Sequence, residues 1–200
     1  MSEFELHKYS GMAYESKQII TFSKNPTLAL PDVNEEMKFH VGVPSVQVSD
    51  LTQKEFDYFV ENYGDHFESI YFFQNTKVKD LSALSKLKKV KYLLFYNVRG
   101  NSLWDMSKNE GLRGIMISDS KKMLFDLEQL QFAPKIEELL LFSSTFNKYT
   151  VKTISPLRNC KKLKRLFIEF NTEDKSFSPE DFDFLDVFKY QCDRKRNFTY

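Results

Sequence analysis

The chain has little of several residue types that particular chemistries require. Its 200 residues include 2 Cys, 6 Gly, 6 Pro and 1 Trp. No GxGxxG, GxxxxGK[ST] or GxSxG pattern occurs, so a phosphate-cradling loop or a nucleophile elbow has no sequence support. His7, His40 and His66 lie far apart, and none has a carboxylate or cysteine at metal-ligand spacing. The sequence predicts no metal, no cofactor and no enzyme, although an active site assembled from distant residues stays open as a third hypothesis.

Long apolar runs are also missing. No stretch approaches eighteen uninterrupted apolar residues, so no membrane span is predicted. The first eight residues lack a basic segment followed by an apolar one, which is the pattern of a secretory signal. Cys160 and Cys192 have no CxxC or histidine partner nearby, so two idle thiols in a cytoplasmic protein are the simplest interpretation, with a disulfide as the alternative.

The net charge of +1 conceals an uneven distribution. Residues 67–171 carry 19 basic and 10 acidic side chains, a net charge of +9. Residues 1–66 carry a net charge of −6 and residues 172–200 a net charge of −2. The near-neutral total therefore does not exclude a local basic surface.

What the sequence does contain is a repeat. An apolar triplet with the spacing apolar-x-x-apolar-x-apolar begins at residues 43, 67, 90, 112, 136 and 163, at intervals of 24, 23, 22, 24 and 27 residues. The fullest copy runs from Phe67 to Asn75 and closes on an asparagine, which returns only at Asn171. Even spacing of this kind indicates a repeated strand-and-return unit that buries its apolar side only by stacking on its neighbours.

These units resemble the leucine-rich repeat family in its short bacterial, internalin-type form over about residues 43–171. The closest likeness lies in residues 78–93, and residues 154–163 repeat the phrase. The resemblance implies an α/β solenoid, a short horseshoe of about six parallel strands on a concave face with helical or 3-10 segments on the convex side. The family's asparagine ladder is incomplete, because Leu51, Val98, Ser120 and Ser144 occupy the other closing positions.

The flanks are expected to cap the repeats. Residues 1–42 are predicted to form an N-terminal cap with strands at 17–22 and 37–41, and residues 172–200 a C-terminal helical cap with a basic tail at 194–196. Thr52 and Glu55 have the capping-box spacing and predict a helix that ends at Gly64. Ser178 and Pro179 predict a second helix, which would cover the last repeat with Phe182, Leu185, Val187 and Phe188.

Side chains that alternate with the buried triplet should form columns across the concave face. The central column reads Gln47, Tyr71, Leu94, Met116, Leu140 and Phe167, which is apolar or aromatic in five of six positions. We predict a partner-binding surface at Tyr71, Phe73, Tyr92, Leu94, Tyr96, Met116, Leu140, Phe142, Phe167 and Arg165. The alternative is that the chain's own flanks cover this sheet.

Lysines and arginines at the predicted turns add a basic edge. They are Lys86, Lys88, Lys89, Lys91, Lys121, Lys122, Lys161, Lys162, Lys164 and Arg165. A basic edge beside an apolar floor suits an acidic protein partner, whereas solvated turns are the plainer interpretation and nucleic acid a weak alternative. The neighbouring acidic pair at 137–138 is expected to be solvated.

The leading functional hypothesis is a non-catalytic protein-binding module in the cytoplasm. One concrete version is a bacterial immunity protein that neutralises a toxin with an acidic surface, because a small module of this kind is expected to act by covering something. The alternative is an adaptor or scaffold subunit of an intracellular complex. The oligomeric state stays open.

Overall fold

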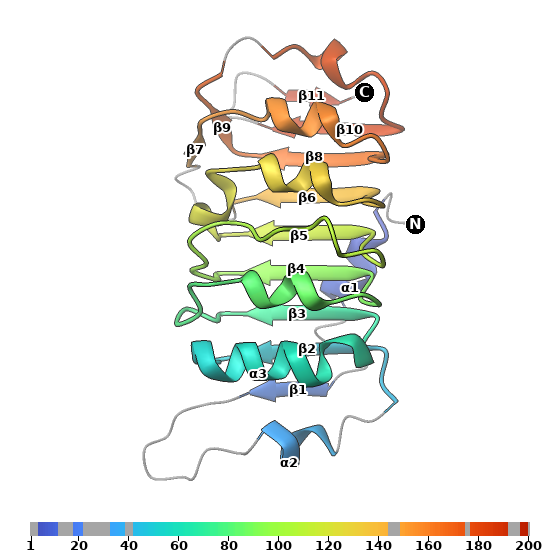
Figure 1. Cartoon of the computed structure of the whole chain (residues 1–200). Helices are drawn as coiled ribbons and strands as arrows, with labels where there is room; N and C mark the ends of the chain where they lie inside the picture. The colour runs from blue at the N-terminus through green and yellow to red at the C-terminus, as the bar shows by residue number, and fades with distance from the viewer. Residues whose placement is uncertain are drawn as a thin grey trace.

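The computed structural model is α/β with a mostly parallel sheet of nine strands (Figure 1). It describes residues 4–11, 18–21, 33–38, 42–143, 149–174, 177–191 and 197–199. The spatial order is β1-β2-β3-β4-β5-β6-β8-β10-β11, so each strand lies beside the next sheet strand in the sequence. All neighbours are parallel except β10 and β11.

The six predicted strands are confirmed. They are β2 (Ser45–Ser49), β3 (Ser69–Phe73), β4 (Tyr92–Tyr96), β5 (Gly114–Ser118), β6 (Glu138–Phe142) and β8 (Arg165–Glu169). The first residues of β3, β4, β5, β6 and β8 are aligned in register across the sheet, so equivalent positions of the repeat are direct neighbours. The columns predicted from alternation are therefore present.

The sheet continues past both ends of the repeat region. On one side β1 (Gln18–Thr21) pairs with β2, which confirms a strand within 17–22. On the other side β10 (Val187–Gln191) pairs with β8, and β11 (Asn197–Thr199) follows β10. A separate pair is formed by β7 (Thr150–Val151) and β9 (Asn171–Thr172).

Helices and 3-10 segments connect the strands across one side of the sheet, which we call the helix face (Figure 1). They are helix α3 (Gln53–Tyr63) and the 3-10 segments η1 (Gly64–His66), η2 (Ser82–Lys86), η3 (Lys121–Leu124), η4 (Glu128–Phe132) and η5 (Ser155–Asn159). Side chains such as Ile70, Leu93 and Ile115 are fully buried against them and form the main core. A single strand cannot bury its apolar side chains, and here the return segment that follows each strand packs over them as a second layer.

Helix α3 (Gln53–Tyr63) has the predicted capping box. The carboxylate of Glu55 accepts a hydrogen bond from the Thr52 N–H at 2.7 Å, and the Thr52 hydroxyl accepts one from the Glu55 N–H at 3.4 Å. Gly64 follows with φ −51°, a right-handed conformation that any residue can adopt, so this position does not need glycine for its backbone angles. A Cβ at Gly64 would lie 2.4 Å from Leu87 Cδ2, so a larger residue here would force the Leu87 side chain to move.

Two predictions for the flanks are wrong. Met37 does not begin a strand but ends helix α2 (Val33–Met37), where its buried side chain joins the main core; residues 39–41 of the predicted strand lie outside the described residues. The C-terminal helix is only one 3-10 turn, η6 (Pro179–Phe182), capped by Ser178 and Asp181. Val187 and Phe188 belong to strand β10, because pairing with β8 satisfies backbone groups that a helix would leave at the sheet edge. The predicted basic tail at 194–196 lies outside the described residues.

The turns after the strands explain the incomplete asparagine ladder. The first residue after each of four strands has positive φ: Asp50 (58°), Gln74 (54°), Asn97 (50°) and Asp119 (51°). The fully buried Asn75 accepts a hydrogen bond from the Leu51 N–H at 2.9 Å and donates one to the Val48 carbonyl at 2.8 Å. Ser120 replaces it two turns later, where its hydroxyl accepts from the Val98 N–H at 2.9 Å. The hydroxyl of Ser120 therefore accepts the backbone hydrogen bond that an asparagine side chain accepts in the turn after β3.

Candidate binding face

The side of the sheet opposite the helix face carries helix α1 (Leu6–Gly11), and we call it the α1 face (Figure 1). Three apolar residues of the predicted central column are buried there. Leu94 is 0% exposed, Met116 4% and Leu140 1%. Phe4 and Leu6 pack on them in a second apolar cluster, separate from the main core. The alternative that the chain covers its own sheet therefore holds for the middle of this face, which we call the covered middle (Leu94, Met116 and Leu140).

A buried carboxylate fixes the start of α1. Glu138 is 2% exposed, and its two oxygens accept hydrogen bonds from the backbone N–H groups of Glu5 (3.2 Å) and Leu6 (3.1 Å). Arg165 donates to the same carboxylate at 2.5 Å, so the buried charge has a cationic partner. The expectation that Glu138 is solvated is wrong, because the N-terminal backbone donors replace water around it.

Glycine makes room for α1. A Cβ at Gly114 would lie 3.0 Å from Leu6 Cγ and 2.9 Å from Tyr92 Cδ1, closer than side chains normally approach. Any larger residue at this position of β5 would push either the helix or the tyrosine ring away. The sequence thus supplies a recess in the sheet at the point where Leu6 is fully buried.

The last contact of α1 is aromatic. The rings of Tyr9 and Tyr92 stack with centroids 4.4 Å apart, and the Tyr9 hydroxyl donates to Glu68 at 3.0 Å. Burial and then the hydrogen bond to Glu68 raise the pKa of Tyr9 well above its usual range. Burial also raises the pKa of Tyr92. Both phenols are therefore held in their neutral form while α1 is docked.

Five predicted site residues remain half-buried beside α1, and we call them the aromatic flank: Tyr71, Phe73, Tyr96, Phe142 and Phe167. Phe73 and Tyr96 stack with ring centroids 5.1 Å apart and planes 15° apart. Tyr71 meets Phe73 edge-on at 5.8 Å, and Phe142 lies 6.1 Å from Phe167. Each ring stands on a regular strand, so the flank is a rigid surface of aromatic side chains.

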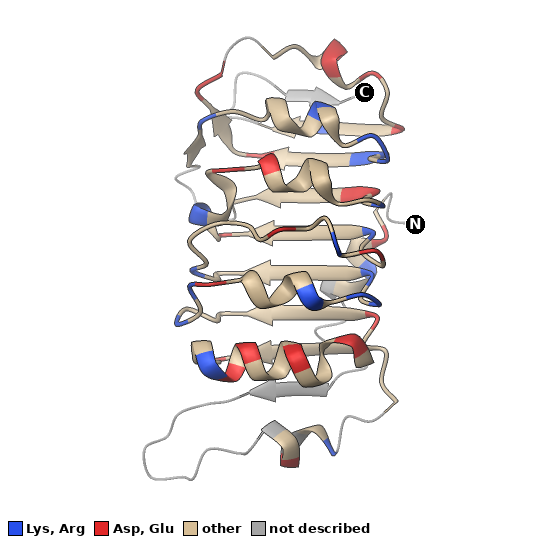
Figure 2. Cartoon of the chain, in the orientation of Figure 1, with Lys and Arg blue, Asp and Glu red and all other residues tan. Residues whose placement is uncertain are grey.

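The basic edge is divided between the two ends of the strands (Figure 2). Lys91 and Lys164 directly precede the first residues of β4 and β8, as predicted for turns that enter strands. Arg113, which was not part of the predicted basic edge, has the same position before β5. Lys121 and Lys122 instead begin η3, after β5 has ended, so their assignment to an entering turn is wrong. Since Phe73 and Tyr96 are the last residues of their strands, cations at this carboxyl end lie at the same end as the flank.

Three cations at the carboxyl end crowd one another. The pKa of Lys79 is lowered by partial desolvation and by the positive charges of Arg99 and Lys122. Several cations elsewhere are already paired: Lys86 with Glu61, Lys91 with Glu68 and Arg158 with Asp181. The repulsion among Lys79, Arg99 and Lys122 marks a position where an added negative charge would stabilise the surface.

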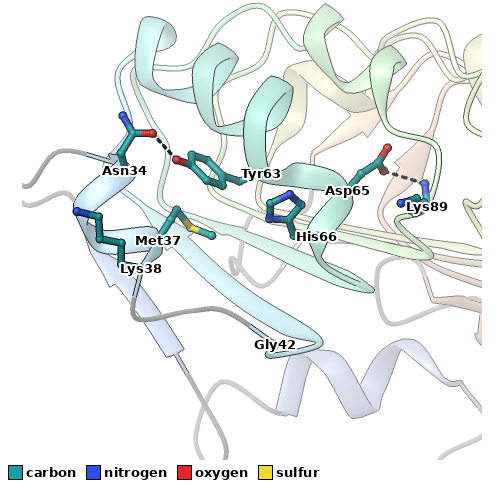
Figure 3. Close-up of a pocket in the computed structure, with 8 residues that line it drawn as sticks. All are labelled: Asn34, Met37, Lys38, Gly42, Tyr63, Asp65, His66 and Lys89. Atoms are coloured by element: carbon teal, nitrogen blue, oxygen red, sulfur yellow. Dashed lines mark hydrogen bonds between the residues drawn. The ribbon is translucent and has the colours of Figure 1, made fainter.

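A pocket of about 600 Å³ lies between α2 and η1 (Figure 3). Its lining includes Tyr63, which donates to Asn34, and His66, whose ring meets the Tyr63 ring edge-on at 5.7 Å. The Asp65 carboxylate accepts from the backbone N–H groups of Lys88 (2.9 Å) and Lys89 (2.8 Å). Tyr63 thus joins α3 to α2, and Asp65 joins η1 to the turn before β4.

Metal and thiol chemistry gain no support from the described residues. Within them no group of three metal-ligating side chains comes together, and no helix has both the length and the apolar content to cross a bilayer. Cys160 is a buried free thiol, and burial raises its pKa to about 12, which disfavours the reactive thiolate. Cys192 lies outside the described residues.

Sequence reasoning found the columns but missed what covers them. Two residues predicted to bind a partner help to hold α1: Tyr92 stacks on Tyr9 of that helix, and Arg165 is paired with Glu138. Phe4 and Leu6 were not identified as important, because so short a segment has no apolar periodicity to detect. The available signal was Gly114, a glycine between Tyr92 and Glu138 in the same column of the sheet.

Comparison with known proteins gives little functional guidance. Residues 40–108 match a family model described as a domain of unknown function (DUF4848). The matched segment includes β2, α3, β3 and β4, and the match does not identify a leucine-rich repeat family. No curated protein matches the chain.

Proposed function

We propose that this chain is a non-catalytic protein-binding module, built as a short leucine-rich-repeat solenoid, that binds an acidic protein through its aromatic flank. The repeat spacing, the register of equivalent strand positions and the one-turn return segments support the solenoid. The free buried thiol of Cys160 suits a reducing compartment, so we place this activity in the cytoplasm.

The observation that carries the proposal is the half-buried aromatic flank next to the covered middle. The chain buries Leu94 completely under its own N-terminus and yet leaves the stacked rings of Phe73 and Tyr96 partly accessible. Aromatic side chains that are ordered before binding lose little entropy at an interface and are enriched at interface centres. The cations at the same end of the strands would speed the approach of an acidic surface.

Two versions of this function differ in what the partner is. In the first, the module is a bacterial immunity protein that covers the active surface of a toxin. In the second, it is an adaptor that holds subunits of an intracellular complex together. The same surface serves both, so the identity of the bound protein separates them.

The test is capture of binding proteins by three forms of the purified chain. One form is wild type, one carries Phe73→Asp and Tyr96→Asp, and the matched control carries Phe125→Asp and Phe132→Asp, two rings that are each 51% exposed on return segments. We expect one acidic protein to bind the wild type and the control, to be lost from the flank variant, and to dissociate as salt rises. Equal retention by the flank variant, with its fold intact by circular dichroism, overturns the proposal.

The bound protein then decides between the two versions. A toxin should arrest growth when expressed alone, and co-expression of the wild-type chain but not the flank variant should restore growth. A subunit of a larger assembly that shows no such toxicity favours the adaptor.

A further inference from the structure

Three successive turns at the amino ends of the strands enclose a strongly basic pocket. It has a volume of about 390 Å³ and lies away from the carboxyl ends at which Phe73 and Tyr96 stand. Its lining comprises four cations and one carboxylate: Arg113, Lys135, Glu137, Lys162 and Lys164. The pocket therefore carries a net charge of +3 on five side chains, counted from their formal charges.

The repeat itself brings these side chains together. Arg113, Glu137 and Lys164 each directly precede the first residue of a strand, and those first residues are in register. The Glu137 N–H donates to the Arg113 carbonyl at 2.7 Å, and the Lys164 N–H donates to the Glu137 carbonyl at 2.9 Å. Their side chains consequently leave neighbouring strands at the sheet spacing of roughly 4.8 Å. Lys135 and Lys162 occupy the equivalent position two residues earlier in their turns.

Glu137 bonds to two of the four cations and leaves most of the positive charge of the pocket uncompensated. One carboxylate oxygen accepts from Arg113 at 3.1 Å and the other from Lys164 at 2.8 Å. The hydrogen bond from Lys164, and then its positive charge and that of Arg113, keep the pKa of Glu137 below its usual value against the opposing effect of burial. Lys135 and Lys162 are exposed, and neither has an ion pair within the part of the chain that the structure describes.

We propose that this pocket binds a phosphate group, free or carried on a phosphorylated side chain of another protein. A phosphate monoester brings a charge of about −1.5 to −2 near neutral pH, which matches the excess positive charge better than a single carboxylate does. Its oxygens can accept several hydrogen bonds at once, and the guanidinium of Arg113 and the ammonium groups of Lys135 and Lys162 can donate them. The main-chain hydrogen bonds between the three turns hold the donors at fixed spacing before the anion arrives. The proposal is independent of the aromatic flank.

Calorimetric titration with inorganic pyrophosphate tests the pocket. We expect a dissociation constant of about 1 mM or below in low salt for the wild-type chain. In the variant Lys135→Glu, Lys162→Glu we expect the affinity to be about tenfold lower. The matched control, Lys77→Glu with Lys122→Glu, makes the same charge change at the carboxyl ends and should leave the affinity unchanged. If the control weakens binding as much as the pocket variant, a diffuse charge effect explains the result and the site is refuted.

A second titration separates the two sources of phosphate. The probe is a short neutral peptide with one phosphoserine, compared with the same peptide unphosphorylated. Phosphate-dependent peptide binding that the pocket variant abolishes assigns the site to a phosphorylated protein, whereas binding of pyrophosphate without the peptide assigns it to a free anion. Absence of binding by both probes to the wild-type chain overturns the proposal.

Discussion

The covered middle is aliphatic and the aromatic flank consists of rings, and although both lie on the same sheet face they differ in exposure. Leu94, Met116 and Leu140 are at most 4% exposed, whereas the flank rings stay half-buried. The difference does not arise from the strands, which have the same length and register. It arises from α1, a six-residue helix whose position depends on Gly114 and Glu138. Accessibility of a sheet face is thus decided by a few residues distant in sequence.

The largest effect should come from detaching α1. Leu6→Asp places a carboxylate where the leucine is fully buried, so we expect a loss of about 2–4 kcal/mol in the free energy of unfolding. The loss is bounded because the helix can leave while the main core stays intact. Urea unfolding measures it, and increased binding of a hydrophobic dye should report the exposed middle. The matched control Phe132→Asp, at a side chain 51% exposed, should change stability by less than about 0.5 kcal/mol. A Leu6→Asp variant as stable as this control contradicts the docked position of α1.

A smaller effect is expected at the recess. Gly114→Ala should cost about 1–2 kcal/mol of unfolding free energy, because the new methyl group meets Leu6 and Tyr92. In a chain that already carries Leu6→Ala, the cost should fall by about half or more, since one of the two contacts has been removed. Unfolding of the two single variants and the double variant gives the coupling energy. Strict additivity would show that Gly114 does not serve α1.

The flank should matter less to stability. Tyr96→Ser removes the ring that stacks on Phe73. Because the Tyr96 ring is already partly exposed to solvent, we expect a loss of only about 1 kcal/mol in unfolding free energy. Urea unfolding beside Leu6→Asp makes the comparison direct. A loss as large as that of Leu6→Asp would mean that the flank is structural, and would remove the main support for a binding surface there.

The smallest effect concerns pH. The pKa of Tyr9 is raised in the folded chain, so the stability from its neutral form is fully present below the unfolded value of about 10 and is lost as the pH rises above it. We expect α1 to dock less tightly in alkali, and Tyr9→Phe to remove part of this dependence. Amide hydrogen exchange of residues 4–9, followed by mass spectrometry at several pH values, measures the docking. An identical alkaline dependence in Tyr9→Phe would assign it to other groups.

The sequence predicted the regular part of the fold because each strand carries the same apolar spacing. Six strands, the capped helix α3 and the alternating columns all follow from local pattern. The C-terminal segment was misjudged because Phe182, Leu185 and Phe188 recur at helical spacing, although pairing with β8 decides the structure. Local patterns contain no information on such edge pairing.

The candidate site was predicted only in part, for a different physical reason. Alternation located the flank, but the burial of its neighbours depends on contacts between residues more than a hundred positions apart, such as Leu6 with Glu138. A short apolar segment such as residues 4–6 could pack at many positions on an apolar sheet face. Only the coincidence of a missing Cβ at Gly114 and a buried acceptor at Glu138 selects one.

The anchoring of Leu6 by Glu138 also sets an order of events during synthesis. Leu6 is made before its acceptor, which lies 132 residues later in the chain. At a translation rate of about 5–20 residues per second, Leu6 waits roughly 7–26 s before Glu138 is added. During that interval an apolar segment and an unfinished sheet edge are both open to other chains. The docking of α1 therefore follows the synthesis of β1 to β5, and holdase chaperones have a defined window in which to act on the N-terminal segment.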